Sequence, residues 1–551
     1  MRIPRSATRS RTAAWLAALA ALALLAFPGV ASAAVTATFA AGVLTVSSDG
    51  ADGIAITCVG GNVKVNGADP APAATCASVD TIDVTGGPGS NAISLVGVTI
   101  ALFPAIASVD VDGAAGNDTI TGSEIDDDLF GGEDDDRIIG DNNPAGTRDN
   151  SVGGSGRDTL VWNPGDGDDI NEGGSETDTI EVNGGGGGEQ FTVAPSTTAG
   201  RIAFDRVAPA PFNLDIGTSE RLDLNAGGGD DSLTSTTADG FALDIDGGNE
   251  NDTLDGGDGP DLIAGGAGND RIIGDNNPGG TRDTSVGGDG DDTLVWNPGD
   301  GDDTNEGGAG TDTIEVNGGG GGEQFTVKPS TTAGRVLFDR TGPTPPGPFN
   351  LDIGTSERLV LNAGDGNDRI TGANGLASLI ESTLNGDGGN DRITGTDGAD
   401  RLTGGAGNDV IRSRDTQADR VNCGGGFDIA RVDRRDIVSG CNIVFGGRQR
   451  VRLLGNTARV VLGRAVLRLR CVATRRCSGT VRLLRGSRSL GTARFRATRG
   501  RTKIVRVRLN RRGRRLVARA PRTGVRVTAQ INARDSAGNG WRTTKRIRLR
   551  R

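Results

Sequence analysis

Three aspartates at a spacing of nine residues, Asp252, Asp261 and Asp270, form the pattern in this chain that most clearly indicates chemistry. Each is the sixth residue of a nonapeptide, and the three nonapeptides GGNENDTLD, GGDGPDLIA and GGAGNDRII run consecutively through residues 247–273. The paired glycines that open each unit allow tight turns with positive φ and leave the backbone carbonyls accessible. Carboxylate and carbonyl oxygens are the hard ligands that Ca²⁺ takes at about 2.3–2.6 Å, and flexible cages of this kind favour it over the smaller Mg²⁺. The spacing therefore predicts a row of calcium sites.

An apolar residue at the eighth position keeps register with the aspartate, as Leu254, Ile263 and Ile272 do. One such residue per nonapeptide cannot form a core alone, but two short strands per coil, stacked coil on coil, form a thin two-sheet roll. Stacked aspartates would repel one another unless a cation lay between them. A flexible acidic linker is the alternative, and it does not explain the shared register of aspartate and apolar residue.

The nonapeptide recurs in consecutive runs at 113–139 and 386–412, and in single units between these runs and as far as Asp428. Three units in register, present three times, resemble the hemolysin-type calcium-binding repeats of RTX proteins, G-G-x-G-x-D-x-U-x. The resemblance implies a parallel β-roll with the ion between like turns of successive coils. It implies that Asp118 pairs with Asp136, Asp252 with Asp270 and Asp391 with Asp409, while Asp127, Asp261 and Asp400 face the other edge.

The expected calcium ligands are carboxylates of the sixth-position type together with glycine carbonyls. The carboxylates are Asp118, Asp127, Asp136, Asp158, Asp169, Asp178, Asp252, Asp261, Asp270, Asp292, Asp303, Asp312, Asp368, Asp391, Asp400 and Asp409. The carbonyls are those of Gly247, Gly256, Gly265, Gly268, Gly404 and Gly407. Many relatives of this type carry an uncleaved C-terminal export signal and a membrane-active region, which this chain lacks, so pore formation is not expected.

Composition agrees with a thin repeating structure. The 551 residues include 92 glycines, 3% aromatics, one methionine and no tyrosine or histidine, which is too little bulk for a thick core along the whole chain. The expected fold class is all-β: a parallel β-roll or β-solenoid with β-rich inserts, followed by an immunoglobulin-like β-sandwich.

Four segments are expected. Residues 1–33 have basic residues, an apolar run and a small-residue cleavage site, as in an export signal. Residues 34–112 alternate apolar and polar residues, which predicts a β-module that covers the first coil. Residues 113–447 hold the nonapeptides and predict the calcium-binding roll. Residues 448–551 alternate apolar residues with arginine, which predicts the basic β-sandwich.

The roll contains an internal duplication. Asp136–Arg206 recurs as Asp270–Arg340 almost residue for residue, at an offset of 134 residues. Each copy includes a β-rich insert that lacks the nonapeptide pattern.

The six cysteines form three local pairs. Six cysteines allow fifteen pairings, and nearest-neighbour pairing is the simplest, which predicts Cys58–Cys76, Cys423–Cys441 and Cys471–Cys477. Zinc binding is a weaker alternative because the chain has no histidine and no C-x-x-C motif. Disulfides and the export signal together indicate a secreted, extracellular protein, and no transmembrane segment is expected.

Charge is strongly segregated. About 33 of the 59 basic residues follow residue 447, against one acidic residue, Asp535, while the segment between signal and tail has a net charge of about −48. The basic domain could bind an anionic cell-wall or extracellular polymer. Alternatively, the basic domain docks on the acidic segment of the same chain, or its arginines only form the solvent-exposed face of the strands. Specific nucleic-acid binding is not expected, because Phe495 and Trp541 are its only aromatic residues.

The chain is expected not to be an enzyme. Without histidine it lacks the H-E-x-x-H metalloprotease site and histidine-based triads. A carboxylate pair could still hydrolyse glycosides, but acidic residues are so frequent here that pairs arise by chance. The leading hypothesis is a secreted calcium-binding protein with a structural or adhesive role at the cell surface or in the extracellular matrix. The alternative is a secreted carbohydrate-active enzyme or polysaccharide-binding protein that uses the roll as a scaffold.

Overall fold

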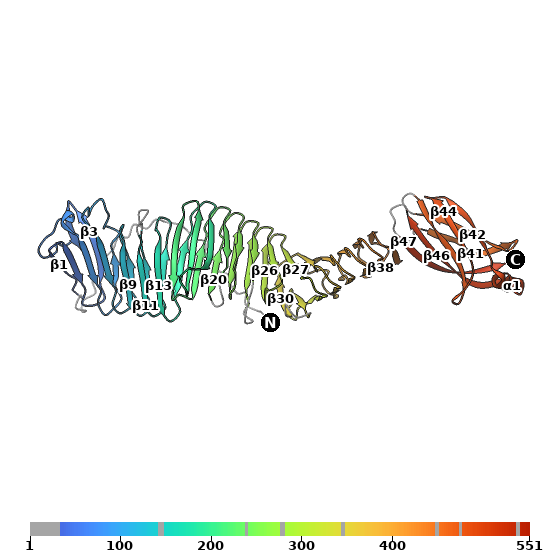
Figure 1. Ribbon diagram of the computed structural model, residues 1–551, viewed down its shortest axis with the longest axis horizontal. Coiled ribbons are helices and arrows are strands. Elements are labelled where there is room, and N and C mark those ends of the chain that lie inside the picture. Colours follow the sequence, from blue (N-terminus) through green and yellow to red (C-terminus); the bar gives the residue numbers. More distant parts are fainter. Residues whose placement is uncertain are drawn as a thin grey trace, which may run out of the picture.

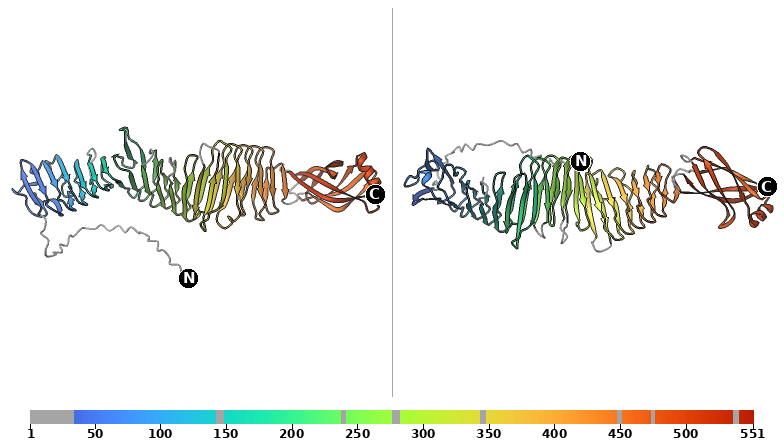
Figure 2. Two further views of the ribbon diagram at one scale, coloured as in Figure 1. Left: turned by 90° about the horizontal axis from the view of Figure 1, so that it is seen from below. Right: turned by 45° about the horizontal axis from the view of Figure 1, so that its top comes forward.

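The computed structural model describes residues 34–141, 148–236, 241–275, 282–342, 348–446, 451–472, 476–535 and 540–551. The expected export signal, residues 1–33, lies outside the described residues. The protein is an elongated rod of stacked coils with a separate C-terminal unit at one end (Figure 1). The two further views show the same extended outline, with that unit always at the end of the rod (Figure 2).

The rod consists of two long sheets, and the chain alternates between them. The first sheet contains, in spatial order, β1 (Thr36–Ala40), β2 (Val43–Ser47), β5 (Thr81–Thr85), β7 (Ser108–Asp112), β9 (Asp127–Glu133), β11 (Asn150–Ser155), β13 (Asp169–Ser175), β17 (Phe212–Gly217), β16 (Arg201–Ala208), β15 (Gln190–Pro195), β19 (Ser232–Ser235), β21 (Thr253–Asp255), β23 (Arg271–Ile273), β25 (Thr293–Trp296), β27 (Thr313–Asn317), β31 (Arg358–Asn362), β33 (Glu381–Asn385), β35 (Arg401–Thr403), β37 (Arg420–Asn422) and β39 (Ile437–Ser439). The second sheet contains β4 (Asn62–Val65), β3 (Gly53–Val59), β6 (Ala92–Ser94), β8 (Thr119–Thr121), β10 (Arg137–Ile139), β12 (Thr159–Trp162), β14 (Thr179–Asn183), β18 (Arg221–Asn225), β20 (Ala242–Asp246), β22 (Leu262–Ala267), β24 (Thr284–Asp289), β26 (Asp303–Ala309), β30 (Phe349–Gly354), β29 (Val336–Arg340), β28 (Gln324–Pro329), β32 (Arg369–Gly372), β34 (Arg392–Thr394), β36 (Val410–Ser413), β38 (Ile429–Val432) and β40 (Ile443–Gly446). Most neighbours are parallel, which confirms the expected all-β fold with long parallel sheets.

The core of the rod is one side chain deep. In these nonapeptides the eighth-position residue is the second residue of its strand and its side chain points inward, and Leu254, Ile263 and Ile272 are at most 1% exposed. Strands of the two sheets alternate along the chain, and their inward residues form two core clusters, one over residues 44–138 and one over residues 160–444 together with Trp541. Full burial of each such side chain stabilises the fold by about 1.5–3 kcal/mol. Stacking many coils therefore supplies what a single nonapeptide cannot.

The block at residues 34–112 is part of the same stack. Its strand β5 pairs in parallel with β2 on one side and with β7 on the other, and β7 pairs with β9 of the first nonapeptides. The open end is closed by two antiparallel hairpins, β1–β2 and β3–β4. A short 3-10 helix, η1 (Cys76–Ser78), carries the Cys58–Cys76 disulfide close to them.

Each β-rich insert replaces one strand of a sheet by three. In the first copy β15, β16 and β17 run antiparallel to one another, and the flanking strands β13 and β19 pair in parallel with β17 and β15. In the second copy β28, β29 and β30 do the same in the second sheet. The two inserts lie in different sheets because of the length of the repeated module. Each coil contributes one strand position to each sheet, called here a half-coil, and the module spans an odd number of half-coils. As a result, β11 of the first copy corresponds to β24 in the other sheet.

Aromatic rings and a buried ion pair fill each insert. Trp296 stacks on Phe349 with ring centroids 3.7 Å apart, and Trp162 stacks on Phe212 at the same distance. Arg340 pairs with Glu323 at 2.6 Å, and both side chains are 1% exposed. Full burial of the two tryptophans explains their repetition by packing within the core.

The C-terminal unit is a second, mostly antiparallel β-structure with its own core. Its strands pair in the order β44 (Arg488–Thr498), β43 (Arg476–Arg485), β46 (Val525–Asp535), β47 (Gly540–Arg550), β41 (Val451–Val461), β42 (Arg464–Cys471) and β45 (Thr502–Arg508). Between the strands of this unit that the structure describes, β41 and β47 pair in parallel and the other pairs are antiparallel. One helix, α1 (Arg511–Ala518), begins where the side chain of Asn510 accepts the backbone N–H of Gly513.

The C-terminal unit closes the far end of the rod. Trp541 of β47 is paired with Val444 of β40, and its side chain joins the core cluster of the rod. The other two expected disulfides, Cys423–Cys441 at the last coils and Cys471–Cys477 between β42 and β43, are formed as well. No helix among the described residues is long and apolar enough to cross a membrane.

Candidate metal centre

Buried carboxylates stack into ladders along the edges of the rod. At each step the backbone N–H of one residue donates to a side-chain oxygen of the residue one coil further, as Asp252 does to Oδ1 of Asp270 at 2.9 Å. Three long ladders follow this rule: Asn91, Asp118, Asp136, Asp158, Asp178 and Glu220; then Glu189, Asp231, Asp252, Asp270, Asp292, Asp312 and Glu357; and finally Glu323, Asp368, Asp391, Asp409, Asp428 and Asn442.

The ladders change edge at each insert. Residues of the first and third long ladders stand just before second-sheet strands, whereas those of the middle ladder stand just before first-sheet strands. The opposite edge carries short ladders: Asp127, Asp149 and Asp169; Asp261, Asp283 and Asp303; and Asp400, Asp419 and Asp436. The structure therefore places each expected pair on one edge, and Asp127, Asp261 and Asp400 on the other.

In most of these aspartates the second oxygen, Oδ2, is buried and has no hydrogen-bond partner. Such an oxygen belongs to Asp118, Asp136, Asp158, Asp178, Asp231, Asp252, Asp261, Asp270, Asp292, Asp312, Asp368, Asp391, Asp409, Asp419 and Asp428, and Asp415, which lies outside the ladders, has one as well. An unsatisfied buried acceptor costs about 1–3 kcal/mol, and more when it is charged. A row of such groups is stable only if each takes up a proton or shares a cation.

The glycine that opens each unit provides the space beside Oδ2. A β-carbon added at Gly247 would overlap Oδ2 of Asp252 and would lie 2.6 Å from the carbonyl oxygen of Gly265. In the neighbouring coil, Gly266 follows Gly265 and has φ +102°. A β-carbon at Gly266 would overlap the carbonyl oxygen of Gly248. Carboxylate and carbonyl oxygens from neighbouring coils thus border one small space, an all-oxygen donor set that suits Ca²⁺.

Burial raises the pKa of the ladder carboxyls. Desolvation is the main cause at Asp252, with repulsion from Asp231 and Asp270 added, and its pKa is raised to about 7. At Asp261 desolvation, followed by repulsion from Asp255 and Asp258, raises the pKa to about 8. Without a cation these groups therefore hold protons close to neutral pH, and a divalent ion must displace them.

Not all of the expected ligands share this environment. Asp127 accepts hydrogen bonds from the backbone and hydroxyl of Ser123, and Asp400 accepts the same pair from Thr396, because a serine or threonine replaces the second glycine of those units. Asp169 and Asp303 lie in the short ladders without an unpartnered Oδ2. The other twelve expected aspartates each have a buried Oδ2 without a hydrogen-bond partner.

The expected carbonyl ligands also differ in their surroundings. The carbonyls of Gly265 and Gly404 lie beside the carboxylates of Asp252 and Asp391. Those of Gly268 and Gly407 instead face a glycine of the next coil, Gly290 and Gly426 respectively. A calcium role for all six glycine carbonyls stays a prediction.

Several ladder residues were absent from the sequence prediction. Asp231 and Asp428 occupy the sixth position of AGGGDDSLT and CGGGFDIAR, so the period alone identifies them. Asp149 and Asp283 follow loops of irregular length, and Asp419 follows a loop that breaks the register. For these three only the stacking of coils reveals the position.

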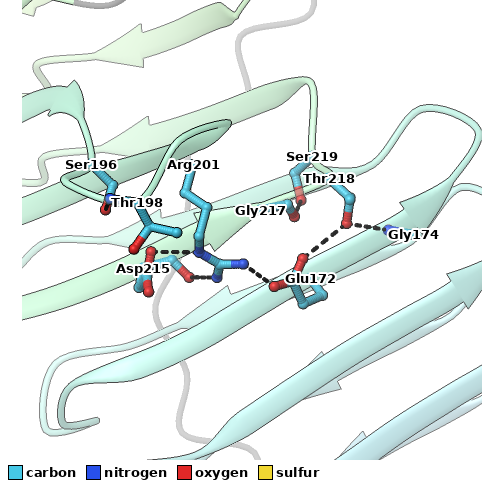
Figure 3. A network of polar contacts seen from close by, with 9 residues as sticks. All are labelled: Glu172, Gly174, Ser196, Thr198, Arg201, Asp215, Gly217, Thr218 and Ser219. Atoms are coloured by element: carbon cyan, nitrogen blue, oxygen red, sulfur yellow. Dashed lines mark hydrogen bonds and ion pairs between the residues drawn. The ribbon is translucent and has the colours of Figure 1, made fainter.

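A second polar cluster lies in each insert and has another role. Arg201 donates to Asp215 at 2.7 Å and to Glu172, whose other oxygen accepts the hydroxyl of Thr218 (Figure 3). Arg335 makes the equivalent contacts to Asp352 and Glu306 in the second copy. Both carboxylates are engaged by one guanidinium. In the first copy, the cluster connects β16 and β17 of the insert to β13 of the preceding coil.

Comparison with known proteins assigns the repeats. The model of the RTX calcium-binding nonapeptide repeat matches residues 112–143, 246–277, 278–295, 360–375 and 383–414. These segments contain the middle portions of the ladders, including Asp118, Asp252 and Asp391. A search of the curated proteins finds no match to the chain. The nonapeptides are thus RTX calcium-binding repeats, and the resemblance seen in the sequence is confirmed.

Proposed function

We propose that this calcium-binding RTX repeat protein is a secreted rod with a structural or adhesive role at the cell surface or in the extracellular matrix. The observation that carries the proposal is the set of three long carboxylate ladders, which extend from Asn91 to Asn442 and so run along most of the rod. Calcium bound between the coils would couple the stiffness of the whole rod to the concentration of the ion outside the cell.

Three features support an extracellular location. The three disulfides require an oxidising compartment to persist. Residues 1–33 have the pattern of an export signal. Sites with many backbone ligands and few charges per ion are typical of the weaker calcium affinities that match extracellular concentrations.

The proposed role of the C-terminal unit is to bind an anionic extracellular polymer. Exposed arginines Arg485, Arg526, Arg546 and Arg550, together with half-buried Arg548, line one groove across β43, β46 and β47. Acidic groups spaced along a polymer would contact several of them at once. We also assign this unit to the immunoglobulin-like sandwiches, supported by its mostly antiparallel strands around one core and by the parallel pairing of β41 with β47.

Calcium coupling is tested on the full mature chain by small-angle scattering and far-UV circular dichroism, with excess calcium and with EGTA. We expect the calcium-free chain to stay folded but to lose part of its β-signal and to become more flexible, with a smaller radius of gyration. Identical scattering curves and spectra in the two conditions would refute a calcium-stiffened rod.

Polymer binding is tested by co-sedimentation with an anionic wall polysaccharide at low and high salt. A triple charge reversal at Arg485, Arg526 and Arg546 should abolish binding. The same change at exposed Arg468, Arg506 and Arg512, outside the groove, should only weaken it. Equal losses in both variants would indicate a general charge effect, and binding that ignores salt would contradict the electrostatic mechanism.

A second candidate, polysaccharide binding without a charge requirement, is favoured by a cavity of about 360 Å³ where the rod meets the C-terminal unit. Exposed Phe427 and the edge of Trp541 border it, together with Asn442 and Asn532. Replacing Phe427 by alanine should reduce binding to a neutral glycan in this case. The proposal includes no catalytic step, and turnover of any polysaccharide by the pure protein would overturn that part of it.

A further inference from the structure

Three carboxylates meet on one edge of the rod near its C-terminal end, one from a nonapeptide and two from the less regular segment that follows it. Asp400 precedes β35, Asp419 precedes β37 one coil later, and Asp415 lies in the loop between β36 and β37. One oxygen from each of the three lies within 4.8 Å of the other two. Asp415 and Asp419 lie beyond the residues that match the RTX repeat, which end at 414 in this region.

The cluster contains buried oxygens without a hydrogen-bond partner. Asp419 is 0% exposed; its Oδ1 accepts the backbone N–H of Asp400 at 3.0 Å, whereas its Oδ2 is unpartnered. Oδ2 of Asp415 is also buried and unpartnered. Two buried oxygens that lack a donor and face a third carboxylate at this distance are stable only if the groups take up protons or share a cation.

Hydrogen bonds hold the three groups in place. Thr396 donates its backbone N–H and its hydroxyl to Asp400, each at 2.7 Å. The backbone N–H of Gln417 donates to Oδ1 of Asp415 at 2.7 Å, which fixes the loop. Because these hydrogen bonds fix the positions of Asp400 and Asp415, the cluster is arranged before any ion binds.

We propose that Asp400, Asp415 and Asp419 form a separate cation site that takes a hard divalent ion, Ca²⁺, and binds it more tightly than the repeat sites do. A ladder step supplies one carboxylate from each coil, whereas here the loop adds a second carboxylate from the same coil. Three negative charges around one ion attract it more strongly than two, and three carboxylates with open geometry favour calcium over magnesium.

The site connects the last coils of the rod. Asp419 donates its backbone N–H to Asp436, whose Oδ2 accepts the hydroxyl of Ser413 at 3.0 Å. The Cys423–Cys441 disulfide ties the same coils together. An ion here would therefore fasten the loop of Asp415 onto coils that the disulfide already joins, close to where the C-terminal unit is attached.

The test is calcium equilibrium dialysis of the full mature chain, wild type against Asp415→Asn, at free calcium low enough to leave weak sites empty. We expect the wild type to bind one tight calcium ion and Asp415→Asn to bind it roughly tenfold or more weakly. Glu381→Gln removes an equal charge from the exposed strand β33 at the same end of the rod and should leave the tight ion unchanged. A wild-type affinity in Asp415→Asn would overturn the proposal.

A second variant separates this site from the repeat sites, on which the proposed function rests. Asp252→Asn should reduce the number of weak ions and leave the tight one. If the repeats bind no calcium at all, the tight ion should still be counted in both the wild type and Asp252→Asn. Far-UV circular dichroism in saturating calcium checks that each variant is folded, and a folded wild type with no tight ion would also overturn the proposal.

Discussion

Asp252 donates its backbone N–H to Oδ1 of Asp270 at 2.9 Å, and Oδ2 of Asp270 is buried with no partner. One carboxylate thus performs two tasks: one oxygen joins successive coils, and the other lies ready for a cation. Because the first task uses only an acceptor, an asparagine could perform it, whereas the second needs charge.

Asp270→Asn should therefore separate folding from calcium binding. The new amide keeps Oδ1 and places its NH₂ where Oδ2 was, close to the carbonyl of Gly287, to which it can donate. We expect the calcium-free protein to gain about 1–2 kcal/mol of stability and the stabilisation by calcium to shrink. Denaturant unfolding in EGTA and in calcium measures both, with exposed Asp246→Asn as the control. A loss of stability in EGTA would contradict this account of Oδ2.

Acid should stabilise the calcium-free protein. The pKa values of Asp252 and Asp261 are raised to about 7 and about 8, mainly by burial, so the folded chain binds protons that the unfolded chain has lost. The free energy of unfolding in EGTA should rise as pH falls from about 8 toward about 4 and then level off.

In calcium the trend should reverse, because protons compete with the ion and the apparent affinity falls with pH. Melting temperatures at pH 5.5, 7.0 and 8.5, with and without calcium, test both trends. Parallel curves in the two conditions would show that ladder protonation is not linked to the ion.

Gly247→Ala should be strongly destabilising in calcium and in EGTA alike. Its β-carbon would overlap Oδ2 of Asp252 and crowd the carbonyl of Gly265, and neither group can withdraw from the buried ladder. A cost of about 3 kcal/mol is expected. Gly186→Ala is the matched control, since its β-carbon would have no atom within 4 Å, and its effect should stay within about 0.5 kcal/mol. Both are measured by chemical denaturation.

The buried ion pair of the second insert should depend on both partners. Arg340→Met leaves Glu323 buried without its cation and should cost about 3–5 kcal/mol. Adding Glu323→Gln removes the isolated charge and should restore part of that loss. Lys64→Met breaks the more exposed pair with Asp69 and should cost about 0–1 kcal/mol. No recovery in the double variant would mean that packing, not charge, determines the stability of this site.

The sequence predicts the rod well where its period is strict. Aspartate and the apolar residue two positions later share one register, so a period of nine suffices to stack Asp252 on Asp270 and to bury Ile263 and Ile272. The three cysteine pairs were also predictable, because each pair is local in sequence.

Other features depend on how coils meet, which no local pattern records. Residues 34–112 lack the nonapeptide, yet their strands continue the same parallel ladder, because a strand needs only alternating burial to join it. Asp419 follows a loop that shifts the register, so its position under Asp400 depends on the coil above. Ser123 and Thr396 change the hydrogen bonding of Asp127 and Asp400, and a repeat consensus hides such substitutions.

The odd number of half-coils in the repeated module has a mechanical consequence. Every copy rotates whatever follows it by half a turn about the long axis, so a chain with one copy fewer or more would present its basic C-terminal unit on the opposite side. The same alternation moves the cation-binding rows from one flank to the other and back. If ion binding shortens these rows, the curvature that it produces on one flank of the rod is opposed by the curvature that it produces on the other.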